Sequence, residues 1–65
     1  MTVYDLWYVW SDLEDDTRID LYSSGGDLLE LNIKMSDICR RYGGATVYTF
    51  GSTAKPNRKI ITIEV

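Results

Sequence analysis

Residues 18–33 read Arg-Ile-Asp-Leu-Tyr-Ser-Ser-Gly-Gly-Asp-Leu-Leu-Glu-Leu-Asn-Ile, which is the clearest secondary-structure pattern in the chain. Apolar and polar residues alternate on both sides of the Gly-Gly pair, which is the pattern of strands with one buried face. Gly-Gly accepts the positive φ that tight hairpin turns require. The stretch therefore predicts a β-hairpin, with strands over 18–23 and 28–33 and a turn over 24–27.

Alternation assigns the side chains of this hairpin to two faces. On the first strand, Ile19 and Leu21 are expected to face inward and Tyr22 outward. On the returning strand, Leu29 and Leu31 are expected to share one face. The apolar members of these and the other rows form the predicted core, which comprises Leu6, Ile19, Leu21, Leu29, Leu31, Ile38, Val47, Ile61 and Ile63.

The flanking sequence extends the hairpin into a larger sheet. Residues 2–10 are rich in β-branched and aromatic side chains, which favours a strand, and alternation makes both of its faces largely apolar. Residues 11–17 follow as an acidic loop. Residues 45–51 and 59–65 show further strand patterns, separated by a loop over 52–58 that holds the only proline.

One short helix is predicted between the third and fourth strands. Its apolar stripe at i, i+3, i+4 and i+7 comprises Met35, Ile38, Cys39 and Tyr42. Ser36 is a good N-cap residue, and Gly43-Gly44 ends the helix. Cys39 lies on the apolar stripe and is interpreted as core filler, with a redox thiol as the alternative.

These elements predict a single α+β domain over residues 1–65, with a small, mainly antiparallel sheet in the order β-β-β-α-β-β and one short helix. One short helix cannot cover a five-stranded sheet. The alternative is therefore a small SH3-like or OB-like barrel, in which the sheet curls on itself. A second subunit covering the sheet would solve the same problem, because large exposed apolar patches tend to mark interfaces.

The residue counts exclude several kinds of site. The chain has 65 residues, no His and one Cys, so it can form neither an internal disulfide nor a His/Cys metal site. Without His the commonest general base is missing, and we expect no enzyme and no cofactor. No apolar run approaches the about 20 residues that span a bilayer, and no signal peptide is apparent. A single free thiol fits the reducing cytoplasm.

The charge is divided along the chain. Residues 1–30 carry eight acids and one base, residues 31–65 carry six bases and two acids, and the net charge is −3. Four of the acids lie close together, namely Asp12, Glu14, Asp15 and Asp16. One interpretation is that acidic and basic strands pair across the sheet; the other is that the acidic loop steers the protein toward a basic partner. A pI of about 4.6 argues against direct nucleic-acid binding.

Aromatic residues are the second unusual feature, since Trp and Tyr dominate binding hot spots. With the acidic loop they give a predicted partner-binding set of Tyr8, Trp10, Asp12, Glu14, Asp15, Asp16 and Tyr22. The favoured hypothesis is a non-enzymatic intracellular protein-binding module with a basic protein partner. A homodimer joined through the face bearing Tyr8 and Trp10 is also expected. The alternative function is a self-assembling homodimeric structural protein without a hetero-partner.

Two resemblances accompany these patterns. Tyr4-Asp5, followed by aromatic residues and an acidic loop, resembles the opening of an SH3 domain over about 20 residues. No tandem Trp pair follows, so the proline-peptide site of that family is not carried over. In size, acidity and compactness the chain is similar to small proteins encoded by phages and mobile elements, including anti-CRISPR inhibitors. That likeness implies an inhibitor that covers a basic nucleic-acid-handling surface of a host protein.

Overall fold

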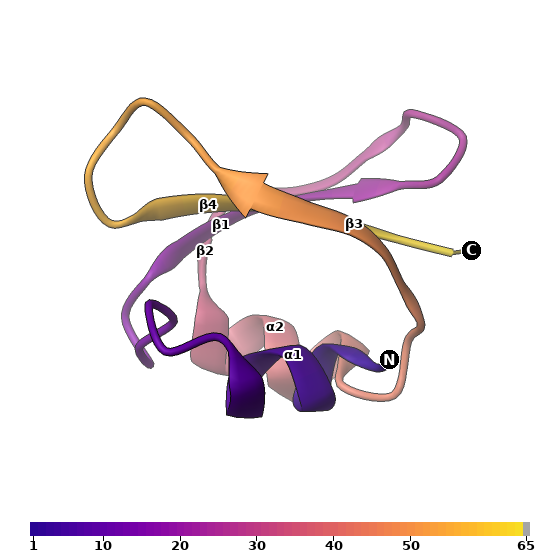
Figure 1. Cartoon of the computed structure of the whole chain (residues 1–65). Helices are drawn as coiled ribbons and strands as arrows, with labels where there is room; N and C mark the ends of the chain where they lie inside the picture. The colour runs from indigo at the N-terminus through magenta and orange to yellow at the C-terminus, as the bar shows by residue number, and fades with distance from the viewer. Residues whose placement is uncertain (65) are drawn as a thin grey trace.

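The structure, a computed structural model, describes residues 1–64, which form one four-stranded sheet and two helices (Figure 1). The α+β class predicted from the sequence is confirmed, whereas the five strands and single helix are wrong. Along the chain the elements are α1 (Val3–Val9), β1 (Arg18–Ser23), β2 (Leu28–Lys34), α2 (Met35–Tyr42), β3 (Val47–Ser52) and β4 (Arg58–Ile63).

The sheet has the strand order β2-β1-β4-β3. β1 with β2 and β3 with β4 are antiparallel hairpins, and β1 and β4 pair in parallel at the centre. The sheet is therefore mixed, and it is open, with β2 and β3 as its edges. The barrel alternative is wrong, because in residues 1–64 the two edge strands do not pair with each other.

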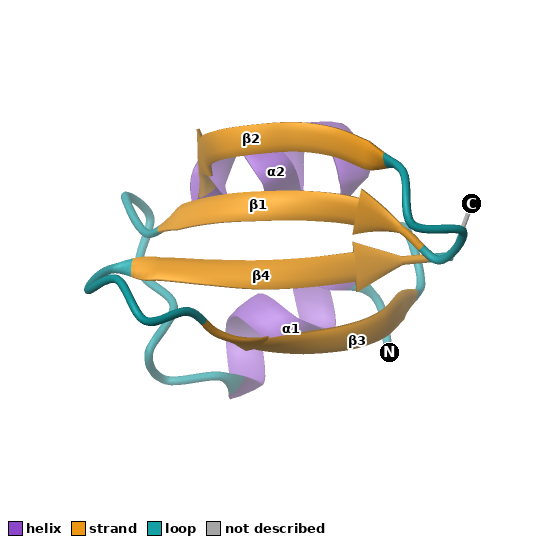
Figure 2. Ribbon diagram, turned by 90° about the horizontal axis from the view of Figure 1, so that it is seen from above, coloured by secondary structure: helices purple, strands orange, loops and turns teal. Residues whose placement is uncertain are grey.

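Both helices lie under one face of this sheet (Figure 2). α1 runs below β3 and β4, and α2 runs below β1 and β2, so the opposite face of the sheet carries no helix. A single helix would have left part of this face for a second subunit to cover. Because two helices lie against it, no second subunit is needed to cover it.

The largest error concerns residues 2–10, which form α1 and not a strand. Thr2 and Asp5 form a capping box: the Thr2 N–H donates to Asp5 Oδ2 at 2.9 Å, and the Asp5 N–H donates to Thr2 Oγ1 at 3.2 Å. The apolar residues have helical spacing, with Val3 and Leu6 fully buried and Trp10 half-buried one turn later. Capping and this stripe together outweigh the strand preference of the β-branched and aromatic side chains.

The predicted hairpin is confirmed, but the alternation fails within β2. Gly26 has φ 97° in the turn, as a tight hairpin requires. Asn32 has φ 58°, and the register between β1 and β2 shifts at this point, which marks a β-bulge. The bulge turns Leu31 outward, where it is 55% exposed, so its assignment to the core is wrong.

The short helix after the hairpin is also confirmed, although it begins at Met35 and Ser36 is not its N-cap residue. Its predicted stripe faces the sheet, with Ile38 and Cys39 buried, and Cys39 is core filler as expected. After the helix, the ring of Tyr4 packs against Gly43 so closely that a Cβ there would overlap it. A helix this short depends on such packing.

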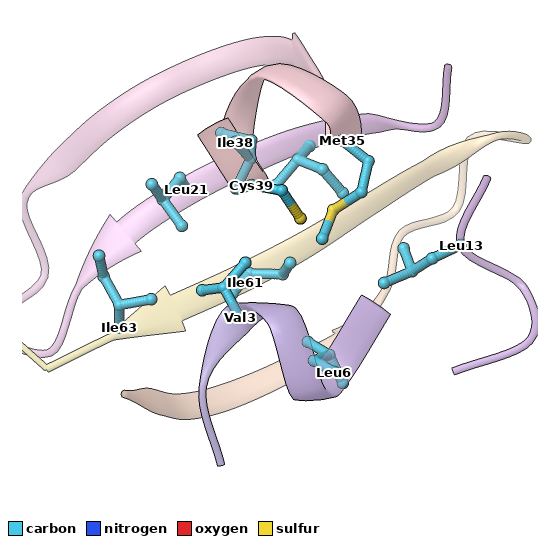
Figure 3. Close-up of a cluster of buried hydrophobic side chains, with 10 residues drawn as sticks. Val3, Leu6, Leu13, Leu21, Met35, Ile38, Cys39, Ile61 and Ile63 are labelled. Carbon is cyan, nitrogen blue, oxygen red and sulfur yellow. The ribbon is translucent and has the colours of Figure 1, made fainter. Parts of the chain in front are cut away.

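The core lies between the sheet and the two helices (Figure 3). Leu29 and Val47, which the sequence assigned to it, are half-buried at its margin. Val3, Leu13 and Met35 belong to it without having been predicted. The buried hydrophobic residues are Val3, Leu6, Leu13, Ile19, Leu21, Met35, Ile38, Cys39, Ile61 and Ile63.

Replacing Leu6 by Ala is expected to lower the free energy of unfolding by about 2–5 kcal/mol, because a fully buried contact of α1 is lost. The matched variant Leu31→Ala removes the same atoms from an exposed side chain and should cost less than about 1 kcal/mol. Urea unfolding followed by circular dichroism measures both. A greater loss for Leu31→Ala would contradict both the helix and the bulge.

Candidate protein-binding surface

The segment from Trp10 to Thr17 connects α1 to β1 and carries the predicted acidic residues. Its backbone is anchored at both ends. The Leu13 N–H donates to the Trp10 carbonyl at 3.0 Å, and the Leu13 side chain is buried. At the other end, the Glu14 N–H donates to Oγ1 of buried Thr17 at 2.9 Å. These hydrogen bonds and the buried Leu13 side chain hold the backbone of the segment in place, while its carboxylates stay outside the core.

The same segment caps α2. The Met35 N–H donates to the Thr17 carbonyl at 2.8 Å, and the Ser36 N–H donates to the Asp15 carbonyl at 3.1 Å. Lys34, the N-cap residue, makes no side-chain capping bond. Backbone carbonyls thus take the place of the N-cap side chain that the sequence predicted.

The carboxylates of Asp12, Glu14, Asp15 and Asp16 are all exposed. Three ion pairs form within residues 1–64: Arg40–Asp37 at 2.9 Å, Arg41–Glu30 at 2.7 Å and Arg58–Asp20 at 2.8 Å. None of the three includes an acid of the segment. Pairing between the acidic and basic halves of the chain therefore accounts for Asp20 and Glu30, and leaves the four clustered acids without an ion-pair partner in the described part of the chain.

Tyr8 is the most exposed aromatic residue that the structure gives for the chain, with 94% of its surface accessible. It lies on α1, one residue after Trp7, and the two side chains line an open hollow of about 300 Å³. Trp7 was not among the predicted site residues. Treating residues 2–10 as a strand placed Trp7 and Tyr8 on opposite faces, so the error in the element concealed their shared hollow.

Trp10 is in contact with the sheet and is not a free surface residue. Its ring is half-buried and packs against Phe50 of β3, with 4.9 Å between ring centroids. Lys59 Nζ lies 5.6 Å from the Trp10 ring centroid, within cation–π range. Trp10 therefore ties the end of α1 to the sheet and offers a partner less free surface than Tyr8.

Tyr22 does not belong to this surface. On β1, Ile19, Leu21 and Ser23 are buried against the helices, and Tyr22 alternates with them. Its side chain therefore lies on the helix-free face of the sheet, whereas Tyr8 lies on α1 below the other face. The other six predicted residues are neighbours along the chain, at the end of α1 and in the segment that follows it, whereas Tyr22 lies apart from them on β1.

The helix-free face has its own charged cluster, centred on Asp20. Arg58 donates to Asp20 from Nε at 3.2 Å and from Nη2 at 2.8 Å, and the Asn32 N–H in the bulge donates at 3.0 Å. The hydrogen bonds from Arg58 are the main reason that the pKa of Asp20 lies below its usual value. This cluster is fully paired and supports the packing of β1, β2 and β4.

The thiol of Cys39 is buried in the core. Cys39 is 3% exposed, and burial, followed by the charge of Asp15, raises the pKa of its thiol to about 11, so the nucleophilic thiolate is scarce at neutral pH. The part of the chain that the structure describes has no group of three potential metal ligands. Neither of its helices has the length and hydrophobicity required to cross a bilayer.

Replacing Asp20 by Asn is expected to lower the free energy of unfolding at neutral pH by about 1–3 kcal/mol, because Arg58 loses a charged acceptor. The lowered pKa means that the carboxylate stabilises the fold above its unfolded value of about 3.9. That contribution disappears as the pH falls through the folded value. Urea unfolding between neutral pH and about pH 3 should show the difference between wild type and variant shrinking toward acid.

Asp27→Asn serves as the control, since Asp27 is exposed in the hairpin turn and belongs to none of the three ion pairs. Its stability should follow wild type within about 0.5 kcal/mol. A difference between Asp20→Asn and wild type that is constant over the whole pH range would contradict the assigned role of the ion pair.

Comparison with known proteins does not identify a family for the chain. No model of a protein family, no curated protein and no solved structure matches the chain. Trp7, Tyr8 and the acidic segment form the candidate binding surface of the described residues.

Proposed function

We propose that the chain is a non-enzymatic protein-binding module that recognises a basic protein through one surface. We call it the acidic–aromatic surface, and it consists of Trp7, Tyr8, Asp12, Glu14, Asp15 and Asp16. The observation that carries the proposal is the exposure of Tyr8 beside the Trp7 hollow, directly before four acids without an ion-pair partner in residues 1–64.

The two halves of this surface have different physical roles. Exposed carboxylates act over roughly a Debye length, about 8 Å at physiological ionic strength, and mainly raise the rate of association with a basic partner. An aromatic ring that becomes buried on binding contributes at short range and mainly slows dissociation. The backbone of the acidic segment is already held by α2 and Thr17, so little order would have to be gained on binding.

The proposed partner is a protein that handles nucleic acid, because such proteins expose dense basic surfaces. The acidic–aromatic surface would cover that basic surface and exclude the nucleic acid. The small size and acidity of the chain, which are similar to those of phage and mobile-element inhibitors such as anti-CRISPR proteins, support this proposal. We place the protein in the cytoplasm, in keeping with a single free thiol.

Binding is proposed in place of catalysis because of the groups available. The chain has no His, and its one thiol is buried with a raised pKa. The strongly paired charges, Asp20 and Arg58, are engaged with each other. A protein-binding surface requires none of these groups to be free.

The test begins with capture of partners from host lysate at low salt on immobilised wild-type protein, followed by kinetics with the purified partner. Neutralising three acids together (Asp12→Asn, Glu14→Gln, Asp16→Asn) should lower the association rate about tenfold and flatten its salt dependence. Tyr8→Ala should leave association unchanged and raise the dissociation rate by about 30-fold, the effect of about 2 kcal/mol at a hot spot. Asp15 is kept, because its charge also acts on the buried Cys39 thiol in the core.

Two control variants define the outcome. Asp27→Asn removes an exposed acid outside the surface, and Tyr22→Ala removes an aromatic residue on the helix-free face. Both should bind as wild type does. If Tyr22→Ala weakens binding and Tyr8→Ala does not, the partner uses the other face of the sheet, and the proposed function of the acidic–aromatic surface is wrong.

A further inference from the structure

Three basic residues lie side by side across the sheet, at the end where β1 and β4 begin and β2 ends (Figure 2). Arg18 of β1 is directly opposite Lys34 of β2 in the antiparallel pair, and opposite Arg58 of β4 in the parallel pair. Partners in register point to the same face of a sheet, and Arg18 alternates with the buried Ile19. The three side chains, which we call the basic row, therefore lie on the helix-free face.

Only one cation of the basic row is balanced by an acid. Arg58 donates twice to Asp20, and both side chains are largely shielded from solvent. Arg18 and Lys34 are exposed, and none of the three ion pairs within residues 1–64 includes either of them. Glu30, the only other acid in β1, β2 and β4, is paired with α2. The row therefore has two cations whose charge no neighbouring strand compensates.

This arrangement costs stability in the protein alone. The Cβ atoms of directly opposite residues are about 4.5–5.5 Å apart, and like charges in such positions destabilise a sheet. The acidic segment before β1 does not offset the cost through an ion pair, because none joins it to Arg18 or Lys34. An anion bound between the two side chains would remove the repulsion, so the basic row indicates an anion site.

The bulge in β2 holds the Arg18 guanidinium in position. Arg18 Nη1 donates to the Asn32 carbonyl at 3.2 Å, and the Asn32 N–H in turn donates to Asp20 Oδ1 at 3.0 Å. This bond uses one of the five guanidinium donors and leaves the others for a ligand. An oriented guanidinium binds phosphate oxygens in pairs, and a lysine ammonium adds a point charge.

We propose that Arg18 and Lys34 bind the phosphate group of a small phosphorylated compound between them. A phosphate monoester carries a charge of about −1.5 to −2 at neutral pH, which matches two cations. The ligand is small, because a chain with a net charge of −3 and four clustered acids before β1 repels a long polyanion. The site lies on the helix-free face, away from Tyr8, and does not depend on the proposed function.

An NMR titration with inorganic phosphate tests the site directly. Chloride is replaced by phosphate at constant ionic strength and at about pH 8, where phosphate is mostly a dianion. The amide signals of Arg18, Asn32 and Lys34 should shift, with a dissociation constant of about 1–10 mM. Arg18→Gln and Lys34→Gln should each weaken binding about tenfold. Arg40→Gln, which removes an exposed cation of α2, is the control and should bind phosphate as wild type does.

Urea unfolding of the same proteins tests the cost of the row. At low salt without phosphate, Lys34→Gln should have an unfolding equilibrium constant about two- to fivefold lower than wild type, because a like charge opposite Arg18 is removed. Phosphate should stabilise wild type and leave Lys34→Gln almost unchanged. Lys34→Arg keeps the charge and should behave as wild type does in both measurements.

Several results overturn the proposal. One is a wild type whose signals do not respond to phosphate up to about 100 mM, and another is a response that Arg18→Gln and Lys34→Gln leave intact. A Lys34→Gln variant less stable than wild type at low salt contradicts the repulsion within the row. Tighter binding of a short oligothymidylate than of inorganic phosphate would make a nucleic-acid strand the ligand, and the assignment of a small compound would be wrong.

Discussion

The structure depends on covering one face of a four-stranded sheet with two helices that are each too short to be stable alone. The inner faces of β1 and β4 carry Ile19, Leu21, Ile61 and Ile63, all fully buried. α1 and α2 bury them only if both are held in place by contacts outside their own turns. The acidic segment supplies one set of these contacts, because it follows α1 directly and its carbonyls cap α2.

In the acidic segment, the backbone and the carboxylates therefore have different roles. The carbonyls of Asp15 and Thr17 and the side chain of Leu13 belong to the fold. The carboxylates project from that fixed path without an ion pair in the described residues, next to the exposed Tyr8. A charged surface whose backbone is already hydrogen-bonded to the fold suits recognition of a basic protein, since less conformational entropy is then lost on binding.

The sequence predicted the hairpin and α2 because alternation, the Gly-Gly turn and a helical stripe are local signals. It failed for α1, because the strand propensity of the β-branched and aromatic residues conflicts there with the Thr2–Asp5 capping box and the helical spacing of Val3, Leu6, Trp7 and Trp10. The exposure of Leu31 depends on the bulge at Asn32, which alternation does not reveal. In the site, clustering identified the acids, whereas the Trp7 hollow and the separation of Tyr22 require the packing of whole elements.

The carboxylates of the acidic segment are charges held on the fold, and we expect them to contribute nothing to its stability. Urea unfolding of wild type and of the triple variant Asp12→Asn, Glu14→Gln, Asp16→Asn, at low salt and at about 1 M NaCl, tests this for three of the four. Mutual repulsion of unpaired acids predicts that the variant is at least as stable as wild type at low salt, and that salt stabilises wild type more than the variant. A variant less stable than wild type at low salt, with the difference removed by salt, would contradict the claim.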